Sequence, residues 1–346
     1  MAKITQYSIE DKRRWDEIVL SFYLYDVFYL SGYSEAFMKE NPENGIPKLL
    51  LYENGEDRAI SVVFIRDVAV DKKMGGRIEK GKYFDLVTPY GYGGFMGRVS
   101  DWDMLNQTYR TYCLNNHYIC EFVRFELFSD FFKHYLGETE TRTHNVVRSL
   151  EISLDEIWMD FKQKVRKNVN RANANQLKII IEANDHHLDD FLRIYYATMD
   201  RTAAEKAYYF SREFFESLSE MKDNAIFFYA TYEERIISAE LVIYGSENCY
   251  SYLGGTDNAY FDVRPNDFLK YEIIKWAKEK GLKNYVLGGG YGADDGIFQY
   301  KYCLAPHGVY DFYIGRTIFD SKLYEFLVSF RENDQLKEDY FPLYRS

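Results

Sequence analysis

Residues 50–67 read LLYENGEDRAISVVFIRD, and residues 227–244 read FFYATYEERIISAELVIY. Each stretch has an apolar segment, a charged turn and a second β-rich segment, which predicts a β-hairpin. The alignment pairs Arg58 with Arg235, Tyr52 with Tyr229, and Ser61 with Ser238. A second shared phrase precedes each hairpin, FYLS at 28–31 and YYFS at 208–211. Two phrases in the same order favour an internal duplication over a chance similarity between two hairpins.

The composition predicts a soluble globular chain with two domains. The chain has 346 residues, of which 47% are hydrophobic and 28% are charged, so each half can bury a core. Aromatic residues make up 18%, with 33 Tyr and 26 Phe, which predicts many rings in the core and in any cleft. The net charge of −11 argues against indiscriminate binding to nucleic acid or anionic membranes. A polyanionic partner would therefore have to bind a local basic patch.

The cysteines and histidines carry no sign of a metal or disulfide site. The four cysteines form no CxxC pair, and His186, His187 and His307 lack nearby cysteine or carboxylate partners. Residues 1–15 have no apolar core of a signal peptide, and no window approaches the roughly 20 apolar residues of a membrane span. These features predict a cytoplasmic protein with no metal, no cofactor and no stable membrane insertion.

The elements between the hairpins indicate a mixed α and β order. Helices are predicted near 101–115, 187–201 and 320–331, and strands near 118–127, 145–152 and 249–253. The clearest helix follows Arg264-Pro265-Asn266-Asp267, carries a wide apolar stripe and stops at Gly281. A strand at 284–287 and three glycines follow it. A dinucleotide site is disfavoured, because residues 291–296 after the glycines read as a loop rather than as the start of a helix.

Four phrases resemble the Fem family of aminoacyl transferases. They are TPYGYGGF at 88–95, FKQKVRKNVNRAN at 161–173, the run at 252–290, and FQYKY at 298–302. The resemblance implies an α+β or α/β fold with two tandem GNAT-like domains, each a mixed twisted sheet flanked by helices. We expect domain 1 at 1–145, domain 2 at 146–315 as the catalytic one, and a C-terminal helical segment at about 316–346 that packs back on domain 1. The chain has no long heptad stretch, so the coiled-coil arm of some members is not expected.

The resemblance also implies an activity. It is the transfer of an amino acid from aminoacyl-tRNA to the amino group of a UDP-linked or lipid-linked peptidoglycan precursor peptide. Two alternatives stay open. One is a GNAT N-acyltransferase that uses acyl-CoA on a cell-wall or polysaccharide amine, and the other is a non-catalytic module that binds tRNA or cell-wall precursors.

A basic stripe precedes the second hairpin. Lys164, Lys167 and Arg171 follow one another at helical spacing, in a stretch that contains no acidic residue. A solvated helix face is one interpretation. The other is a groove wall that binds phosphates of a tRNA acceptor stem or of a diphosphate-linked precursor.

Several substrate contacts are implied by the resemblance. Lys301, with Phe298 and Tyr300 beside it, matches a family motif near the reaction centre, where an ammonium would stabilise an oxyanion or a phosphate. A surface lysine whose stem covers neighbouring rings is the alternative. A family arginine followed by aromatics corresponds to Arg201 and Tyr208. Tyr252 is implied to face the substrate in the same way.

Glu240 stands out without reference to any family. It interrupts an apolar strand, and the ungapped alignment pairs it with Val63, so only the second copy carries an acid there. A carboxylate among apolar neighbours has a raised pKa and could accept a proton from an attacking amine. An outward-facing position is the alternative. If Glu240 is buried, it needs a partner.

The start of the helix at 265 helps to separate the donors. Acyl-CoA users bind a pyrophosphate at a helix N-terminus, where free amides and the helix dipole favour an anion. Here Pro265 donates no amide and Asp267 brings its own negative charge. The acyl-CoA interpretation is therefore disfavoured, although Arg264 remains compatible with it.

Overall fold

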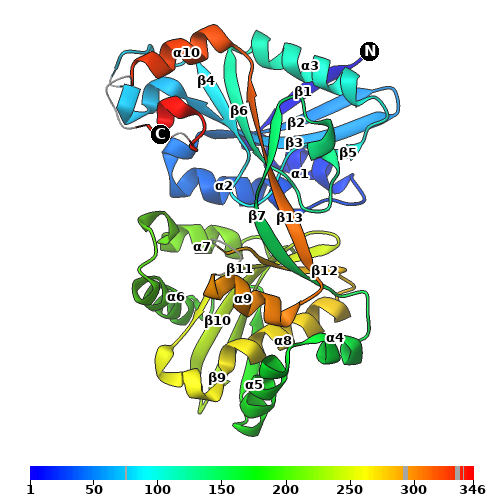
Figure 1. Cartoon of the computed structure of the whole chain (residues 1–346), viewed down its shortest axis with the longest axis vertical. Coiled ribbons are helices and arrows are strands. Elements are labelled where there is room, and N and C mark those ends of the chain that lie inside the picture. Colours follow the sequence, from blue (N-terminus) through cyan, green and yellow to red (C-terminus); the bar gives the residue numbers. More distant parts are fainter. Residues whose placement is uncertain (75, 291–294, 332–335, 338) are drawn as a thin grey trace. The chain divides into compact units, whose positions relative to one another are not determined.

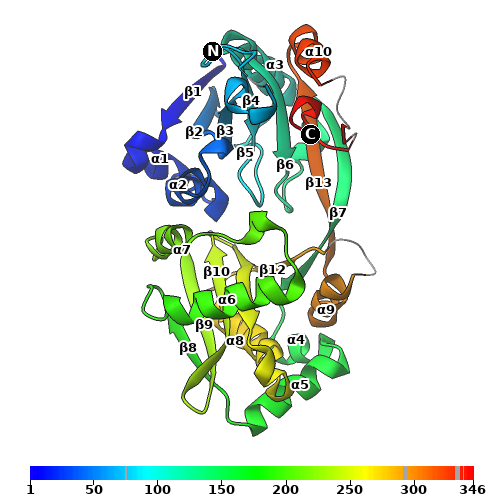
Figure 2. The same ribbon diagram turned by 90° about the vertical axis from the view of Figure 1, so that its left-hand side faces the viewer.

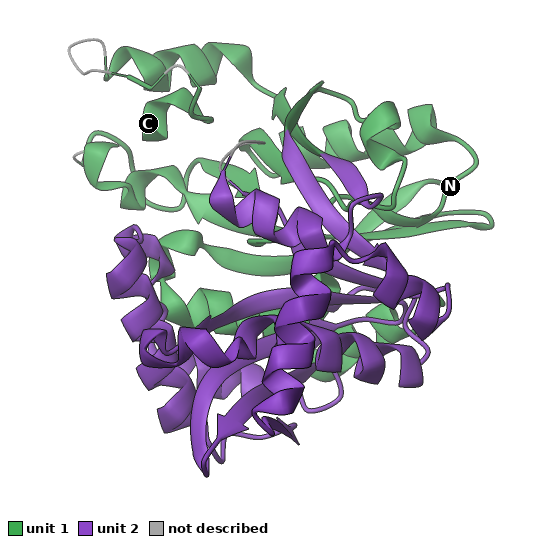
Figure 3. Ribbon diagram, turned by 60° about the horizontal axis from the view of Figure 1, so that its bottom comes forward, with its two compact units in different colours: residues 1–23, 28–142, 312–346 green, residues 24–27, 143–311 purple. Residues whose placement is uncertain are grey.

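The computed structural model describes residues 1–74, 76–290, 295–331, 336–337 and 339–346. The chain forms two compact units (Figure 3). Unit 1 contains residues 1–23, 28–142 and 312–346, and unit 2 contains residues 24–27 and 143–311. Two strands, β7 (Glu138–Ser149) and β13 (Val309–Ile318), each begin in one unit and end in the other.

Unit 1 is a mixed sheet with helices (Figure 1). Its strands are β1 (Lys3–Ser8), β2 (Ile46–Asn54), β3 (Asp57–Asp67), β4 (Phe84–Val87), β5 (Met96–Arg98) and β6 (Tyr118–Arg124), joined by part of β13. Their order is β1-β2-β3-β4-β6-β13, and β5 pairs with β3. Among these neighbours only β4 and β6 run parallel. Its helices are α1 (Lys12–Leu20), α2 (Ser31–Glu40), α3 (Trp102–Asn115) and α10 (Ser321–Ser329).

Unit 2 has the same plan. Its strands are β8 (Lys178–Glu182), β9 (Ala225–Tyr232), β10 (Arg235–Tyr244), β11 (Asn248–Thr256) and β12 (Asn284–Gly288), joined by part of β7. Their order is β8-β9-β10-β11-β12-β7, and only the β11–β12 pair is parallel. The helices are α4 (Leu154–Asp160), α5 (Gln163–Ala174), α6 (Leu188–Thr202), α7 (Arg212–Ser219), α8 (Pro265–Glu279) and α9 (Gly296–Leu304).

The two units therefore repeat one topology. In each unit, the first four strands of the order form three antiparallel pairs, and the fourth and fifth strands form a parallel pair. A helix connects the two parallel strands along the chain, α3 in unit 1 and α8 in unit 2. Parallel neighbours need such a crossover because a tight turn cannot join them. The predicted fold of two mixed sheets flanked by helices is confirmed, and both predicted hairpins form, as β2–β3 and β9–β10.

The hairpin registers correct one detail of the alignment. Both hairpins have two-residue turns, but β10 contains an irregularity between Ile236 and Ser238 that adds a residue to the strand. Counted from the turns, Glu240 pairs with Phe228 as Ser61 pairs with Leu50. The counterpart of Glu240 is thus Ser61 rather than Val63. One residue of this difference comes from the turn, where Arg235 corresponds to Asp57 rather than Arg58, and the other from the β-bulge, which an ungapped alignment cannot detect. The first copy still carries no acid at this position.

Side chains of the unit 2 sheet alternate between two helical layers. Figures 1 and 2 show α6 and α8 against opposite faces of this sheet. The Phe227 ring contacts Phe191 of α6, whereas the ring of the next residue, Phe228, contacts Trp276 of α8. Alternation is what a strand dictates, because successive side chains point to opposite faces. Glu240 is the cross-strand partner of Phe228 and so faces α8.

The C-terminal segment is part of unit 1. Helix α10 contributes Leu327 to a buried cluster that also contains Ile119 and Cys120 of β6. Beyond it, the Arg345 guanidinium lies 2.6 Å from the carboxylate of Asp85, which is fully buried. Because a buried carboxylate needs a partner, this ion pair fixes the last residues of the chain.

Candidate active site

A pocket of about 450 Å³ opens in unit 2 where β11 and β12 diverge. The two strands pair only from Asn248 with Asn284 to Tyr250 with Val286, whereas β11 continues to Thr256. Beyond the last pair, the side of β11 that faced β12 is open. The lining comes from α6, β10, β11, α8, α9 and the segment before α8. It includes Thr198, Arg201, Glu240, Ser251, Tyr252, Gly254, Gly255, Phe261, Arg264, Asp267, Lys270, Ile297, Tyr300 and Lys301.

A buried ion pair forms one wall of the pocket. The Lys270 ammonium on α8 lies 2.5 Å from Oε2 of Glu240 on β10, and both residues are buried. The Tyr285 hydroxyl donates to Oε1 of Glu240, and Lys270 also donates to the Ser251 hydroxyl. Burial, followed by the charge of Glu240, raises the pKa of Tyr285, so its proton stays in place. The outward-facing alternative for Glu240 is thereby excluded, and its expected partner is Lys270.

Lys301 lies on α9, which is introduced by Asp295 accepting a hydrogen bond from the Ile297 amide. The Lys301 ammonium donates to the Gly289 carbonyl at 2.6 Å. Burial, followed by the positive charge of Lys270, lowers the pKa of Lys301 to about 8. The side chain is therefore mostly protonated at pH 7, and an ammonium has two further N–H groups to donate.

The backbone beside Lys301 requires a glycine. Gly288 has a φ of +81°, and a Cβ placed on it would lie 3.3 Å from the Lys301 ammonium. A side chain there would be strained by the backbone and would also crowd the lysine. Because Gly288 has no side chain, the Lys301 ammonium can lie beside it.

A second carboxylate lies at the start of α8. Asp267 is 7% exposed, and its Oδ2 accepts a hydrogen bond of 2.9 Å from the Asn168 side chain on α5. Burial raises the pKa of Asp267, against smaller effects of Asn168, Lys164 and Arg264. Within the described part of the chain, no lysine or arginine forms an ion pair with Asp267. The hydroxyl of Tyr300 is also buried in this wall, and no described residue hydrogen bonds to it.

Two arginines lie in the pocket lining. Arg201, at the end of α6, places its guanidinium 5.2 Å from the Phe261 ring centre. Arg264, at the junction with α8, has a φ of +60°. Among the residues that the structure describes, neither arginine forms an ion pair. Both are available to bind a phosphate or another anion, for which the guanidinium geometry is well suited.

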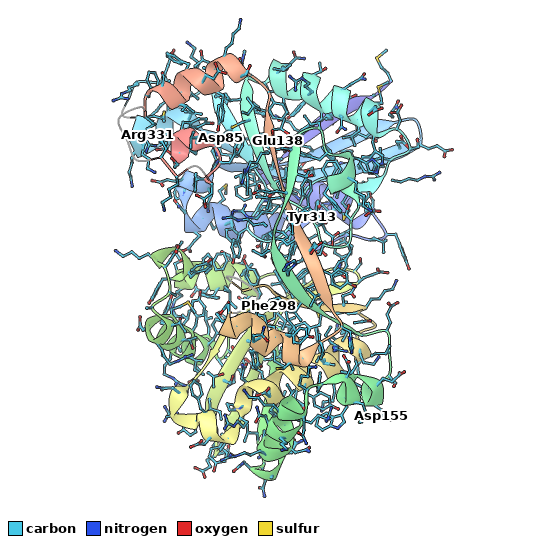
Figure 4. All side chains as sticks on the ribbon, viewed as in Figure 1. Asp85, Glu138, Asp155, Phe298, Tyr313 and Arg331 are labelled. Atoms are coloured by element: carbon cyan, nitrogen blue, oxygen red, sulfur yellow. The ribbon has the colours of Figure 1, made fainter. Side chains whose placement is uncertain are left out.

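The pocket brings together half of the residues predicted from the sequence. Those in its lining are Lys301, Glu240, Arg201, Tyr252 and Tyr300. Phe298 is 7% exposed and packs in the core of unit 2, where Figure 4 labels it on α9. Tyr208 ends a 3-10 helix, Lys206–Tyr208, and its carbonyl accepts from the Tyr195 hydroxyl. Neither lines the pocket, so a substrate contact for these two stays a prediction.

The basic stripe lies on α5. Lys164, Lys167 and Arg171 are exposed, whereas Val165 and Val169 are buried on another side of the helix. The three cations do not line the pocket. The helix is nevertheless linked to it through the hydrogen bond from Asn168 to Asp267.

Lys270 is the main site residue that sequence reasoning missed. It falls on the buried face of α8, in step with Ile273, Ile274 and Ala277. A lysine at an apolar position of a helical repeat, together with an acid in an apolar strand, is the signal that could have paired it with Glu240. Helix α9 was also not predicted, and residues 291–294 of the loop expected before it lie outside the described residues.

The described residues contain neither a candidate metal site nor a helix that could span a membrane. No group of three or more His, Cys, Asp or Glu side chains in the described ranges could hold a metal ion. None of the helices there combines the length and the apolar content needed to cross a membrane.

Sequence comparisons identify relatives of unit 2 and of a short segment. Residues 159–302 match the family of acetyltransferase (GNAT) domains. A lipid II:glycine glycyltransferase from Staphylococcus haemolyticus (strain JCSC1435) is 36% identical over 53 residues. These residues are 15% of this chain and 13% of the glycyltransferase, so the match spans a small part of either protein.

Structural comparisons cover nearly the whole chain. The crystal structure of FemX superposes with a TM-score of 0.72 at 14% identity, over 93% of this chain and 99% of FemX. The C-terminal domain (DUF2156) of a proposed lysylphosphatidylglycerol synthetase from Agrobacterium fabrum superposes with a TM-score of 0.55 at 12% identity, over 92% and 95% of the two chains. At these identities the likeness concerns the fold, and it confirms the predicted architecture.

Proposed function

We propose that this FemAB-like protein, whose residues 159–302 match a GNAT domain, transfers an amino acid from aminoacyl-tRNA to an amino group of a peptidoglycan precursor peptide. The observation that carries the proposal is the pocket between the diverging strands, where Lys301 faces a paired Lys270–Glu240 wall. The relative named lipid II:glycine glycyltransferase supports a peptidoglycan precursor as the acceptor.

The reaction needs alignment and charge stabilisation rather than a covalent intermediate. An aminoacyl ester is already activated, so the neutral amine nitrogen of the acceptor attacks the ester carbonyl carbon directly. The new C–N bond forms, and the C–O bond to the ribose breaks. The electron pair of that bond goes to the ribose oxygen, which takes up the proton that the amine loses. Negative charge develops on the carbonyl oxygen in between.

Lys301 is our candidate for stabilising that oxygen. Its ammonium donates one N–H to the Gly289 carbonyl and has two more that can donate to a substrate in the pocket. Donors that are fixed before the reaction stabilise developing charge without a reorganisation cost. Glu240 is proposed to hold the Lys270 ammonium in its position in this wall through their ion pair. Proton transfer through Glu240 would require the pair to open during the reaction.

The free arginines suit the anionic parts of both substrates. Arg201 and Arg264 line the pocket, and tRNA and a UDP-linked or lipid-linked precursor both carry phosphates. We assign Arg201 to the diphosphate of the precursor, because a planar guanidinium can hold two oxygens at once. Lys164, Lys167 and Arg171 on α5 are proposed to contact tRNA phosphates outside the pocket.

The start of α8 disfavours acyl-CoA as the donor. In an acyl-CoA site, free amides at a helix N-terminus bind the pyrophosphate. Here the first position is Pro265, and the buried carboxylate of Asp267 occupies the pocket side of this helix end. A second anion would be repelled by that carboxylate.

The experiment uses the purified protein, UDP-linked muropeptides and tRNA charged with the twenty amino acids. A mass gain of one amino-acid residue on the muropeptide supports the proposal. Acylation that depends on acetyl-CoA and not on tRNA supports the acyl-CoA alternative. The Lys301→Ala variant tests the binding-module alternative, because a module without turnover has no activity to lose.

A further inference from the structure

We propose that Asp267 binds the α-ammonium group of the transferred amino acid, so that the pocket selects acyl groups with a positively charged nitrogen next to the carbonyl carbon. This inference rests on the proposed function and goes further, because it specifies the chemistry of the acyl group. It makes Asp267 a substrate-specificity residue.

Asp267 is a buried carboxylate that forms a hydrogen bond but no ion pair with the described residues. Its side chain lines the pocket, and the Asn168 amide is its side-chain hydrogen-bond donor. The other buried carboxylate of the pocket, Glu240, has an ammonium at 2.5 Å, whereas no described cation forms an ion pair with Asp267. Lys164 and Arg264 act on the Asp267 carboxylate only from beyond ion-pair distance, and a buried carboxylate without a close cation is costly. An ammonium group from the ligand would supply the missing charge.

The position of Asp267 suits a carboxylate and leaves no place there for a second anion. It lies in the first turn of α8, where the helix dipole favours a negative ligand. A chain that bound phosphate here would keep this end free of acidic side chains. The carboxylate instead gives this helix end a negative side chain that a cationic group can approach, while Arg201 of α6 offers an anion contact elsewhere in the lining. An aminoacyl ester of a nucleotide carries both kinds of charge, with an ammonium on one part and phosphates on another.

Tyr300 provides a second contact for an ammonium. Its hydroxyl is buried in the same lining and has no hydrogen-bond partner among the described residues. Burial, followed by the charge of Asp267, raises the pKa of this hydroxyl, so it keeps its proton. A hydroxyl has two acceptor lone pairs, and an ammonium has three N–H groups to satisfy. Together with Asp267, Tyr300 could accept two of them.

A different role for Asp267 makes a different prediction. As a general base, its carboxylate would take the proton from the acceptor amine, whatever acyl group the donor carries. As an ammonium receptor, it would matter only when the donor carries the α-amino group. A pair of donors that differ only in that group therefore separates the two roles.

The experiment compares tRNA charged with glycine, L-alanine or L-serine with tRNA charged with glycolic, lactic or glyceric acid. The acceptor is a UDP-linked muropeptide, and the proteins are wild type, Asp267→Asn and Asp262→Asn. Asp262 is an exposed residue just before α8 that does not line the pocket, so it is the matched control. Thermal unfolding of each variant checks that it folds.

We expect the wild type to transfer the aminoacyl groups faster than the hydroxyacyl groups. Asp267→Asn should slow aminoacyl transfer about 10- to 100-fold, as expected for loss of a charged hydrogen bond, and change hydroxyacyl transfer less than about twofold. Asp262→Asn should change neither rate. Because an α-ammonium also activates an ester intrinsically, the deciding quantity is the change in the ratio between wild type and variant.

Three results would overturn the inference. If Asp267→Asn lowers the transfer rate equally with aminoacyl-tRNA and hydroxyacyl-tRNA, Asp267 acts as a general base or has a structural role. Equal wild-type rates with the two donors would show that the pocket does not detect the α-amino group, while the proposed function stands, and this comparison needs no variant. Transfer from acetyl-CoA with neither tRNA-borne donor would remove the proposed function and this inference with it.

Discussion

The Lys270 ammonium and the Glu240 carboxylate form a buried ion pair, with 2.5 Å between Nζ and Oε2. One residue comes from helix α8 and the other from strand β10, so the pair joins the helix to the sheet inside the pocket wall. The positive charge of Lys270 also acts on Lys301, whose pKa it helps to lower. The pair thus connects the stability of unit 2 with the charge of the residue that we place at the reacting carbonyl.

Breaking this pair should destabilise unit 2. We expect Glu240→Gln or Lys270→Met to lower the free energy of unfolding by about 3 kcal/mol, because each leaves a buried group without its partner. The double variant should lose less than the sum of the single losses. The control is Lys275→Ala, since Lys275 pairs with Glu272 on the same helix but is 36% exposed, and should cost about 1 kcal/mol or less. Urea unfolding measures all four, and strictly additive losses would contradict the coupling.

The charge of Lys301 should set an alkaline limit on activity. Its pKa of about 8 means that the ammonium is present below that pH and is lost as the pH rises through it. We expect the ratio of the wild-type rate to the Lys301→Arg rate to fall above about pH 8, since arginine keeps its charge. The ratio cancels the titration of the acceptor amine, which is the same in both reactions. A ratio that rises through pH 8 would indicate that Lys301 acts as a base. Lys301→Ala should lower kcat by about 100-fold.

Gly288 should be needed for activity beyond its effect on stability. A Cβ at this position would meet the Lys301 ammonium at 3.3 Å, in a backbone with positive φ. We expect Gly288→Ala to lower kcat about tenfold and stability by about 1 kcal/mol. Gly281→Ala is the control, because Gly281 has a φ of +80° but open space around its Cβ. It should cost the same stability and leave kcat unchanged, and equal effects on kcat would argue against the role of Gly288.

Arg201 should contribute to substrate binding. It has no ion-pair partner among the described residues and lines the pocket. We expect Arg201→Ala to raise KM for the diphosphate-linked precursor about tenfold or more, with kcat within about twofold, because a charged hydrogen bond is lost. Lys206→Ala, an exposed cation outside the lining, is the control. A tenfold loss in kcat at unchanged KM would contradict the assignment.

Unit 1 should lose stability as the pH rises toward neutrality. Burial raises the pKa of Glu121 to about 7, although the Tyr109 and Tyr135 hydroxyls donate to its carboxylate. Because the pKa in the folded protein lies above the ordinary value of 4.5, the stability from the protonated acid is complete below pH 4.5 and is lost as the pH rises through about 7. The free energy of unfolding of unit 1 should fall by about 3 kcal/mol over this pH range.

Glu121→Gln should remove this pH dependence, because an amide does not titrate. Hydrogen exchange of β6 peptides, referenced to β10 peptides of unit 2, measures the effect between pH 5 and 8 and separates the two units. Glu53→Gln is the control, since Glu53 is partly exposed and pairs with the exposed Lys3. A pH dependence that persists in Glu121→Gln would assign it to another group.

Local patterns were sufficient to predict most of the secondary structure. Each hairpin has two largely apolar, β-rich segments around a charged two-residue turn, and α8 has an apolar stripe that starts at Pro265 and ends before Gly281, so each is specified by its own sequence. The bulge at 236–238 could not be found this way, because it is a property of pairing between strands. It displaced the predicted counterpart of Glu240 by one residue, and the alignment was already one residue out at the turn, where Arg235 corresponds to Asp57 rather than Arg58.

The site was predicted in part, for a similar reason. The family motif indicated Lys301, and an acid in an apolar strand indicated Glu240, both of which line the pocket. Phe298 belongs to the same motif but packs in the core, because α9 turns that face of the motif inward. The Lys270 partner lies 30 residues from Glu240 on another element, and only the fold brings the two together.

The donor class is the central claim, and a competition assay tests it most directly. Wild-type protein is incubated with a UDP-linked muropeptide, charged tRNA and acetyl-CoA together, with and without RNase, and the acceptor is weighed by mass spectrometry. We predict a gain of one amino-acid residue that RNase abolishes and that Lys301→Ala strongly reduces. An acetyl gain that survives RNase would contradict the account.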